Sequence, residues 1–331
     1  IATEPRDAFF LLGQFAMKEA RRVRDDAILA GMPAKKGCAD RLRKFLSKHK
    51  GEDGYDFLVG VLEYGVKIKS FDPDEWIHEL TDSIIGDNYP VPPRALVHIE
   101  QIVHDYLVKE MCDGRPPKGK FDLFPVEGGT AAMCYIFDSL MQNGLLKQGD
   151  TIALFLPTFT PYIEIAHLER FQFKIVAINA SSLRADGTHD WHYPATEIAK
   201  LENPKIKLAV TVNPSNPPSV AFSPVEMKQI VRLIRKNPDL VLVTDDVYGT
   251  FVPNFRSLMA EVPHNTICVY SFSKNFGCTG WRLGVIAIHE KNTMDRRIAE
   301  LPASWKQRLN KRYGAMTMAV SYTHLRAHET S

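Results

Sequence analysis

The 331-residue sequence has few cysteines, little net charge and no long apolar runs. Its five cysteines are scattered and show no CxxC spacing, which argues against a disulfide framework or a zinc site and favours a reducing cytoplasm. A formal net charge of +2 gives no general attraction to nucleic acid. The longest apolar runs are far too short to cross a bilayer. These absences favour a cytoplasmic protein that binds a small molecule. We expect it to bind no nucleic acid, membrane or metal.

Both ends of the sequence resemble cut ends. The chain begins at Ile1 without a methionine, and its last segment, 321–331, has no apolar periodicity that joins it to the residues before it. This segment resembles translated sequencing adapter. We therefore expect 321–331 to be a non-native tail and leave it out of the predicted fold.

The first part of the chain has the apolar spacing of amphipathic helices. One is expected over about 6–30, a second over about 39–48, and a later one over 95–112. Another helix is expected to open with Asp72 as its N-cap and Pro73 at its first position. These segments predict a helical N-terminal region.

After about residue 120 the sequence changes to short apolar runs that alternate with helical segments. The runs are LFPVEGG, TIALFLP, KIVAINA, KLAVTVNP, VLVTDD, TICVYSFS and GVIAIHE. Continuous apolar strands of this kind are typical of a parallel sheet that helices cover on both faces. We therefore predict an α/β domain with a mostly parallel sheet over 85–320, preceded by the helical region over 1–84.

Two local patterns resemble a P-loop and a metal site, but each lacks residues that such a site requires. GRPPKGKF has the glycine and lysine spacing of a P-loop, yet Phe121 stands where that loop needs serine or threonine, and two prolines remove backbone donors. The histidines of HDWH, 189–192, lie in a polar stretch without a third metal ligand. Neither a GxSxG nor an HExxH motif is present.

The candidate site residues come where strands end, which is where open α/β sheets bind ligands. EGGTAAM places Gly128, Gly129 and Thr130 at the start of a helix, where backbone N–H groups suit a phosphate. NPSNPPS follows a buried strand and offers rigidly held amides, among them Asn216. VLVTDD ends in two carboxylates, the first of which is Asp245, and a buried carboxylate needs a cationic partner or solvent.

The stretch SFSKNFGCTGWRLG adds a lysine between two serines and an arginine eight residues further on. Lys274 supplies an amine that can form an imine. Ser271, Ser273 and Arg282 can bind a phosphate, for which a planar guanidinium is well matched. Asp245 can keep a pyridine nitrogen protonated, which makes the ring an electron sink. Together these features predict a site for pyridoxal 5'-phosphate.

In this order, SFSK, Arg282 and the upstream DxxY of Asp245 and Tyr248 resemble the motifs of fold type I pyridoxal phosphate enzymes of the aspartate aminotransferase superfamily. The resemblance implies that Lys274 is the catalytic Schiff-base lysine and that Asp245 is the partner of the ring nitrogen. It also implies that Asn216 and Tyr248 hydrogen-bond the ring hydroxyl oxygen.

The same resemblance gives further residues a role. It implies that Gly129 and Thr130 bind the phosphate and that Phe159 of PTFTPY stacks on the ring. Tyr89 of GDNYPVPPR would reach the phosphate of the neighbouring subunit in a homodimer. One departure is that Pro and Ser at 218–219 replace the Thr and Gly of the usual NPTG.

The sequence more closely resembles the bacterial aspartate 4-decarboxylase family. The segments that carry this resemblance are EGGTAAM, SFSKNFGCTGWRLG, RDAFFLLGQFAMKEARR, HELTDSIIGDNYPVPPR and LPTFTPYIEIA. It covers about 1–320. It implies β-decarboxylation of L-aspartate to L-alanine and CO2 through aldimine, ketimine and enamine, allows a side aminotransferase activity, and implies a homodimer that assembles further. It also implies that the family's N-terminal glycine-rich segment and its C-terminal small domain, with the arginine for the substrate α-carboxylate, are missing.

Two alternatives stay open. A plain aminotransferase for dicarboxylic or aromatic amino acids would use the same cofactor site and would differ in water access and carboxylate placement. An inactive cofactor-binding module is disfavoured by the intact Lys274 and Asp245, because binding alone needs neither imine chemistry nor a partner for the ring nitrogen.

Overall fold

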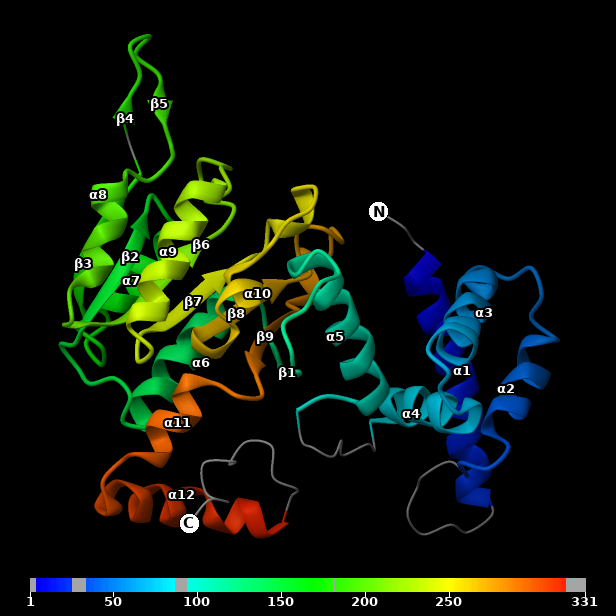
Figure 1. Cartoon of the computed structure of the whole chain (residues 1–331). Helices are drawn as coiled ribbons and strands as arrows, with labels where there is room; N and C mark the ends of the chain where they lie inside the picture. Colours follow the sequence, from blue (N-terminus) through cyan, green and yellow to red (C-terminus); the bar gives the residue numbers. More distant parts are fainter. Residues whose placement is uncertain (1–3, 26–33, 87–93, 181, 320–331) are drawn as a thin grey trace. The chain divides into compact units, whose positions relative to one another are not determined.

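The computed structural model places most of the chain. It describes all residues except 1–3, 26–33, 87–93, 181 and 320–331 (Figure 1). The chain divides into two compact units, Ile1–Gln101 and Ile102–Ser331. This division falls within a helix, whereas the sequence suggested a boundary after residue 84.

Unit 1 is helical in its described part. It contains α1 (Glu4–Asp25), α2 (Cys38–Leu46), α3 (Tyr55–Glu63), a π-helical turn (Tyr64–Ile68), α4 (Pro73–Ile85) and the start of α5 (Val97–Met111). Helix α4 begins as predicted, because Asp72 is its N-cap and the Asp72 side chain accepts a hydrogen bond from the N–H of Glu75 at 3.0 Å. Helix α3 and the π-helical turn were not predicted, since Gly60 and Gly65 weaken the helical pattern there.

The core of unit 1 lies along one face of α1, which packs against α3 and α4. Leu11, Phe15 and Ala16 are buried on this face, as helical spacing requires. The buried Glu19 accepts hydrogen bonds from the guanidinium of Arg41 on α2, with 2.8 Å between Oε2 and Nη2. This pair joins α1 to α2.

Unit 2 contains a seven-stranded sheet in the order β1-β9-β8-β7-β6-β2-β3. The strands are β1 (Phe121–Val126), β2 (Thr151–Leu156), β3 (Lys174–Asn179), β6 (Ile206–Val212), β7 (Val241–Asp245), β8 (Thr266–Ser271) and β9 (Gly284–His289). Neighbours are parallel except that β9 is antiparallel to both β1 and β8. The mostly parallel sheet is as predicted. The direction of β9 was not predicted, because the composition of an apolar strand does not indicate whether it runs parallel or antiparallel to its neighbours.

Helices and short segments complete unit 2. They are α6 (Gly129–Gln142), α7 (Thr160–His167), α8 (Ala195–Ile198), α9 (Pro224–Lys236), α10 (Leu258–Glu261), α11 (Thr293–Ala299), α12 (Ala303–Ala319) and a hairpin of β4 (Ser182–Leu183) and β5 (His189–Asp190). The described part of the chain contains no helix long and apolar enough to span a membrane.

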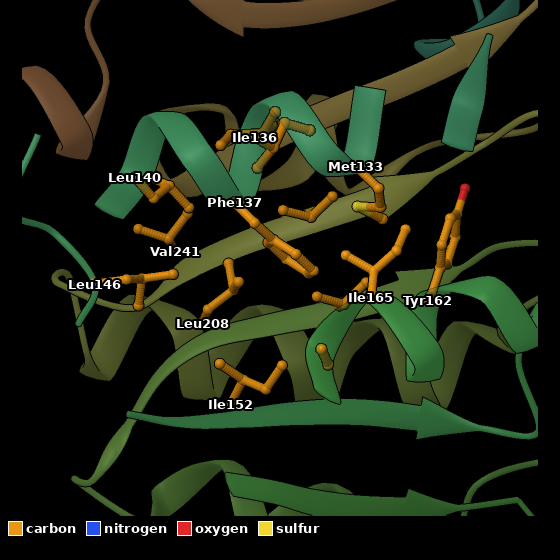
Figure 2. Close-up of a cluster of buried hydrophobic side chains, with 14 of the residues drawn as sticks. Met133, Ile136, Phe137, Leu140, Leu146, Ile152, Tyr162, Ile165, Leu208 and Val241 are labelled. Carbon is orange, nitrogen blue, oxygen red and sulfur yellow. The ribbon is translucent and has the colours of Figure 1, made fainter. Parts of the chain in front are cut away.

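The sheet is buried on both faces. Alternate residues of β2 point to opposite sides, so Ile152 joins the cluster under α6 and α7, and Ala153 joins the cluster under α8 and α9. Figure 2 shows part of the first cluster, which includes Phe137 of α6, Ile165 of α7 and Leu208 of β6. This double cover holds the strand ends in place.

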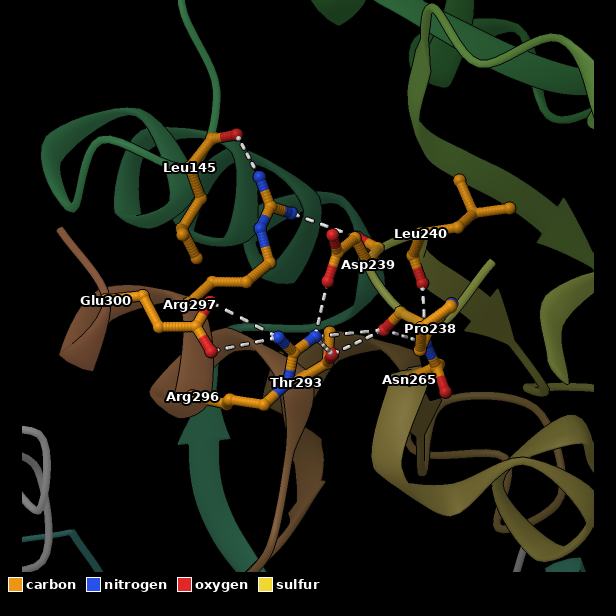
Figure 3. A network of polar contacts seen from close by, with 9 residues as sticks. All are labelled: Leu145, Pro238, Asp239, Leu240, Asn265, Thr293, Arg296, Arg297 and Glu300. Carbon is orange, nitrogen blue, oxygen red and sulfur yellow. Dashed lines mark hydrogen bonds and ion pairs between the residues drawn. The ribbon is translucent and has the colours of Figure 1, made fainter. Parts of the chain in front are cut away.

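A polar network fastens α11 to the loop before β7 (Figure 3). The Arg296 guanidinium contacts Asp239 and Glu300, with 3.2 Å between Nη1 and Glu300 Oε1. Arg297 donates to the carbonyl oxygens of Asp239 at 3.0 Å and Leu145 at 3.3 Å. Burial lowers the pKa of Arg297. The network lies at the amino end of β7, away from the carboxyl end where the site forms.

One edge of the sheet collects the carboxyl ends of β2, β3, β6, β7 and β8. Because β9 is antiparallel to both of its neighbours, β1 also ends at this edge, and β9 begins there. Loops far apart in the sequence therefore meet at one place, as expected for a ligand site in an open α/β sheet.

Candidate active site

A cavity of about 190 Å³ lies at this edge of the sheet. Its lining residues are Gly129, Thr130, Phe159, Tyr162, Val212, Asn216, Asp245, Val247, Tyr248, Ser271, Ser273, Lys274, Thr279 and Arg282. Gly128 directly precedes α6 and lies against Arg282. Tyr89 falls outside the described residues. The other candidate residues are thus brought together, while their roles stay predictions.

Asp245 is the last residue of β7, and its side chain is buried. Its Oδ1 atom accepts a hydrogen bond from the backbone N–H of Val247 at 3.1 Å, and its Oδ2 atom accepts one from the Tyr162 hydroxyl. Burial raises the pKa of Asp245, against the effect of these two hydrogen bonds. A cation placed beside this carboxylate would stabilise its charged form.

The guanidinium of Arg282 is fixed against the turn before α6. It donates to the carbonyl oxygens of Thr279 at 2.9 Å and Glu127 at 3.1 Å. Gly128 has a φ of +100°, and a Cβ atom there would overlap Arg282 Nη2. A glycine is therefore required for this approach, and it leaves the first N–H groups of α6 and the guanidinium beside one another.

Ser273 provides a direct test of whether these residues fit a phosphate. Its side chain is buried, and its Oγ atom has no hydrogen-bond partner among the described residues. Buried hydroxyl groups are normally satisfied, so an unpaired one that faces a cavity indicates a missing partner. Arg282 and the start of α6 line the same cavity, and a phosphate group would satisfy all three. The residues fit a cofactor that carries a phosphate.

Lys274 follows β8 in a turn that α5 supports. Phe272 is stacked near Tyr106 of α5, with ring centroids 6.1 Å apart, and Asn275 donates to the Tyr106 hydroxyl at 3.3 Å. The N–H of Gly277 donates to the carbonyl oxygen of Lys274 at 3.2 Å. These contacts fix the lysine turn on both sides, so that its amine is presented to the cavity.

The remaining predicted residues lie on neighbouring loops. Phe159 precedes α7, is 37% exposed and lines the cavity. Asn216 follows β6 in a loop that is joined to Asp245, because the N–H of Asn213 donates to the Asp245 carbonyl oxygen at 2.9 Å. Burial, with a smaller effect of Asp245, raises the pKa of Tyr248.

The second carboxylate of TDDVY points away from the cavity. Asp246 accepts hydrogen bonds from Thr244 Oγ1 at 2.6 Å, from the Ser257 hydroxyl and from Cys268 Sγ at 3.5 Å. Cys268 belongs to the cluster on the face of the sheet opposite α6 and α7. Asp246 is thus separate from the cavity that Asp245 lines.

The structure also describes the two patterns that resembled a P-loop and a metal site. GRPPKGK forms a loop that leads into β1, so it does not precede a helix as a P-loop does. Of the histidines in HDWH, His192 contacts Glu226 through Nδ1 at 2.9 Å. No group of three or more metal-binding side chains occurs within the described ranges.

Sequence reasoning missed four lining residues. They are Tyr162, Val212, Val247 and Thr279. Tyr162 comes three residues after Phe159, and this spacing alone could have placed both side chains on one side of a helix turn. The tyrosine was overlooked because it lies in an apolar segment that is typical of a core helix.

The chain is similar to a relative with two activities in its name. It is 45% identical over 319 residues to the bifunctional aspartate aminotransferase and L-aspartate beta-decarboxylase of Pseudomonas sp.. The aligned part covers 96% of this chain and 59% of the relative. It is 26% identical to the aspartate aminotransferase of Sulfurisphaera tokodaii over 48% of this chain and 39% of the relative. The chain therefore spans less than two thirds of the length of these relatives.

Solved structures share the fold. The aspartate aminotransferase of Rhodobacter sphaeroides matches with a TM-score of 0.50 and 20% identity, over 62% of this chain and 50% of that chain. A double mutant of the Thermus thermophilus enzyme matches with a TM-score of 0.50 and 18% identity, over 67% and 54%. Both are aminotransferases of fold type I, in agreement with the predicted fold.

A family match covers most of unit 2. Residues 126–325 match the family described as aminotransferase class I and II. This range begins at the end of β1 and includes every cavity residue, so the family assignment and the cavity concern the same part of the molecule. Because the match covers more than half of the sequence, the chain belongs to the class I and II aminotransferase family.

Proposed function

We propose that this protein is a pyridoxal phosphate enzyme that converts L-aspartate to L-alanine and CO2 and also has aminotransferase activity. The observation that carries the proposal is one cavity lined by Lys274, the buried Asp245, and Arg282 beside the unpaired Ser273 hydroxyl. The choice of substrate and reaction is supported by the 45% identical relative, whose name gives both activities.

In the proposed site, Lys274 would hold the cofactor through its amine. Arg282, Ser271 and Ser273 would bind the phosphate together with the first N–H groups of α6, at Gly129 and Thr130. Bound there, pyridoxal phosphate supplies an electron sink for the bonds that break at the substrate. The cavity residues have to orient the substrate, exclude water and move protons.

Phe159 and Asp245, at the end of β7, would hold the cofactor ring. Asp245 would hold the proton on the ring nitrogen, and the cation would in turn stabilise the buried carboxylate. Asn216 and Tyr248 would hydrogen-bond the ring hydroxyl oxygen. Phe159 would stack on the exposed ring face and help keep water out.

The Lys274 amine would also act as the base and acid of the reaction. Lys274 is the one lysine that lines the cavity, within the part of the chain that is described. It can remove the proton at the substrate α-carbon and return protons later. Decarboxylation and transamination would then differ by whether the substrate β-carboxylate is lost before water enters.

We further propose that the minimal unit is a homodimer, in which Tyr89 of one subunit reaches the phosphate site of the other. The proposal includes further assembly of dimers and a cytoplasmic location, which rests on the scattered, unpaired cysteines. Analytical ultracentrifugation of the full-length protein tests the assembly. A monomer with full activity would contradict it.

The reaction is tested by supplying the full-length protein with L-aspartate alone. We expect sustained release of CO2 and L-alanine, because β-decarboxylation needs no second substrate. A plain aminotransferase would stop after one half-reaction per site and leave a stoichiometric amount of oxaloacetate until a 2-oxo acid is added. Oxaloacetate without sustained alanine would contradict the decarboxylase and leave the aminotransferase.

The cofactor site is tested by borohydride reduction and peptide mapping, which fix the cofactor to the lysine that carries it. We expect the label on Lys274 and no label in a Lys274→Ala variant. A label on Lys291 or Lys306 would show that the site is elsewhere.

A further inference from the structure

Tyr162 connects the apolar cluster of unit 2 with the cavity. It lies in the first turn of α7, and its side chain is only 1% exposed. In Figure 2 it stands at one end of the cluster, beside Ile165 and Met133. Its hydroxyl is directed to Asp245 and donates a hydrogen bond to Oδ2. The ring thus packs in the core while the hydroxyl reaches the cavity.

The two Asp245 oxygens depend on different partners. Oδ1 is held by the backbone N–H of Val247 and Oδ2 only by Tyr162, among the hydrogen bonds of the described residues. One hydrogen bond leaves a carboxylate free to rotate about its Cβ–Cγ bond, whereas a bond to each oxygen fixes its plane. Tyr162 therefore determines the direction in which the carboxylate faces the cavity.

The start of α6 leaves little space around this pair. A Cβ atom on Gly129 would lie 3.3 Å from the Tyr162 hydroxyl and 3.7 Å from Asp245 Oδ2. Burial and the nearby Asp245 charge raise the pKa of Tyr162 well above its ordinary value, so the hydroxyl keeps its proton and remains a donor at neutral pH. The donor and the acceptor are thus enclosed in a fixed arrangement.

Tyr162 also supports a second cavity residue. Its ring meets the Phe159 ring edge to face, with centroids 5.4 Å apart and an interplanar angle of 87°. Such a contact restricts the tilt of the partly exposed Phe159 ring. One side chain therefore contacts both a carboxylate and an aromatic ring that border the cavity.

We propose that Tyr162 is a positioning residue, which aims Asp245 at the cofactor ring nitrogen through its hydroxyl and sets the tilt of Phe159 through its ring. This inference rests on the proposed function. It concerns preorganisation, because a carboxylate already aimed at the ring nitrogen loses no free energy on reorientation when the cofactor binds.

The test compares two ligands on one variant. The apo form of the full-length protein, unchanged or with Tyr162→Phe, is titrated with pyridoxal phosphate and with its analogue in which C–H replaces the ring nitrogen. We expect Tyr162→Phe to weaken pyridoxal phosphate by about tenfold, the effect of one hydrogen bond to a charged group, and to leave the analogue unchanged. The ratio of the two affinities does not depend on the fraction of protein that folds.

Two further variants sharpen the test. In an Asp245→Ala background, Tyr162→Phe should no longer change the affinity for pyridoxal phosphate, because the residue through which it acts is gone. Tyr193→Phe is the matched control, since Tyr193 is a buried tyrosine in the cluster on the other face of the sheet. It should change neither affinity.

The outcomes separate the inference from the proposed function. If the unchanged protein does not bind pyridoxal phosphate, the proposed function fails. If it binds, but Tyr162→Phe weakens both ligands equally or neither, the positioning role is wrong while the function stands. An equal loss in the Asp245→Ala background would also overturn the inference.

Discussion

Asp245 and Asp246 are adjacent in the sequence, yet they serve different faces of the sheet. Asp245 pairs in register with Val212 and Val269, which belong to the cluster under α6 and α7, and it lines the cavity. Asp246 has Thr244 and Cys268 as partners on the other face. The alternation of side chains at the end of a strand thus gives one carboxylate to the site and the other to the interior.

Asp245→Asn should keep the cofactor and lose most activity. The amide has nearly the same shape, but it carries no charge to stabilise a protonated ring nitrogen. We expect kcat to fall by about a hundredfold or more, which corresponds to a few kcal/mol, with bound pyridoxal phosphate still visible by absorbance. Asp246→Asn is the matched control and should retain activity. The reverse pattern would assign the ring partner to Asp246.

Gly128→Ala should weaken cofactor binding because of what its Cβ atom would meet. The new methyl group would overlap the Arg282 guanidinium. Gly149→Ala is the matched control, since Gly149 also has a positive φ, +78°, but has nothing within 4 Å of a Cβ atom. Both variants should lose about 1 kcal/mol of stability through backbone strain.

Only Gly128→Ala should reduce the affinity for pyridoxal phosphate, by about tenfold or more, as measured by titration of the apo protein. Equal affinities in the two variants would show that Arg282 does not bind the phosphate.

Single residues also show where sequence reasoning stopped. Lys274, Asp245 and Arg282 could be predicted because they adjoin apolar strands at the edge where ligands bind, and because their side chains suit an imine, a ring nitrogen and a phosphate. Tyr162 could not, because an aromatic residue in an apolar helix is most often a core residue, and it is one here as well. Its second role appears only when α7 and β7 lie side by side.

Elements were predictable where their ends carry a signal of their own. The Asp72–Pro73 start of α4 defines a helix without knowledge of the rest of the chain. The apolar runs similarly define strands. The order of the strands and the direction of β9 depend on pairing partners distant in the sequence, which local composition does not encode. That loops meet at one edge could be expected from the general rule for parallel sheets, but which strands lie side by side there needed the structure.

Asp72→Ala should destabilise α4 by about 1 kcal/mol. The substitution removes the side-chain acceptor of the Glu75 N–H, so that this donor at the start of the helix can bond only to water. Chemical unfolding followed by circular dichroism measures the change. Asp53→Ala, at an exposed position in the turn before α3, is the control and should change stability little. Equal effects would show that the cap is not what holds α4.

At the scale of the whole molecule, the two units differ in what they contribute. Every residue that lines the cavity belongs to Ile102–Ser331, as does the family match at 126–325. The similarity to the Pseudomonas relative extends over 96% of the chain and so includes unit 1. The similarity of unit 1 thus indicates a shared lineage with that relative. Unit 1 contributes none of the described residues that line the cavity.

The stability of the whole molecule should depend on pH through Asp246. Burial raises the pKa of Asp246 from 3.8 to about 7, although Ser257, Thr244 and Cys268 donate to it. Between these two values the folded protein holds a proton that the unfolded chain has lost. The contribution of Asp246 to the free energy of unfolding is therefore fully present below about pH 4 and is lost as the pH rises to about 7.

Asp246→Asn removes this titration, because an amide stays neutral throughout. The free energy of unfolding of the variant minus that of the unchanged protein should increase from about pH 4 to about pH 7, by up to a few kcal/mol, and then level off. Denaturant unfolding at a series of pH values measures the difference, in which the titrating groups that do not interact with Asp246 cancel. A constant difference would mean that the three donors stabilise the buried charge as much as burial opposes it, and a decreasing difference would mean that they stabilise it more. Asp246 would then be charged in the folded protein at neutral pH.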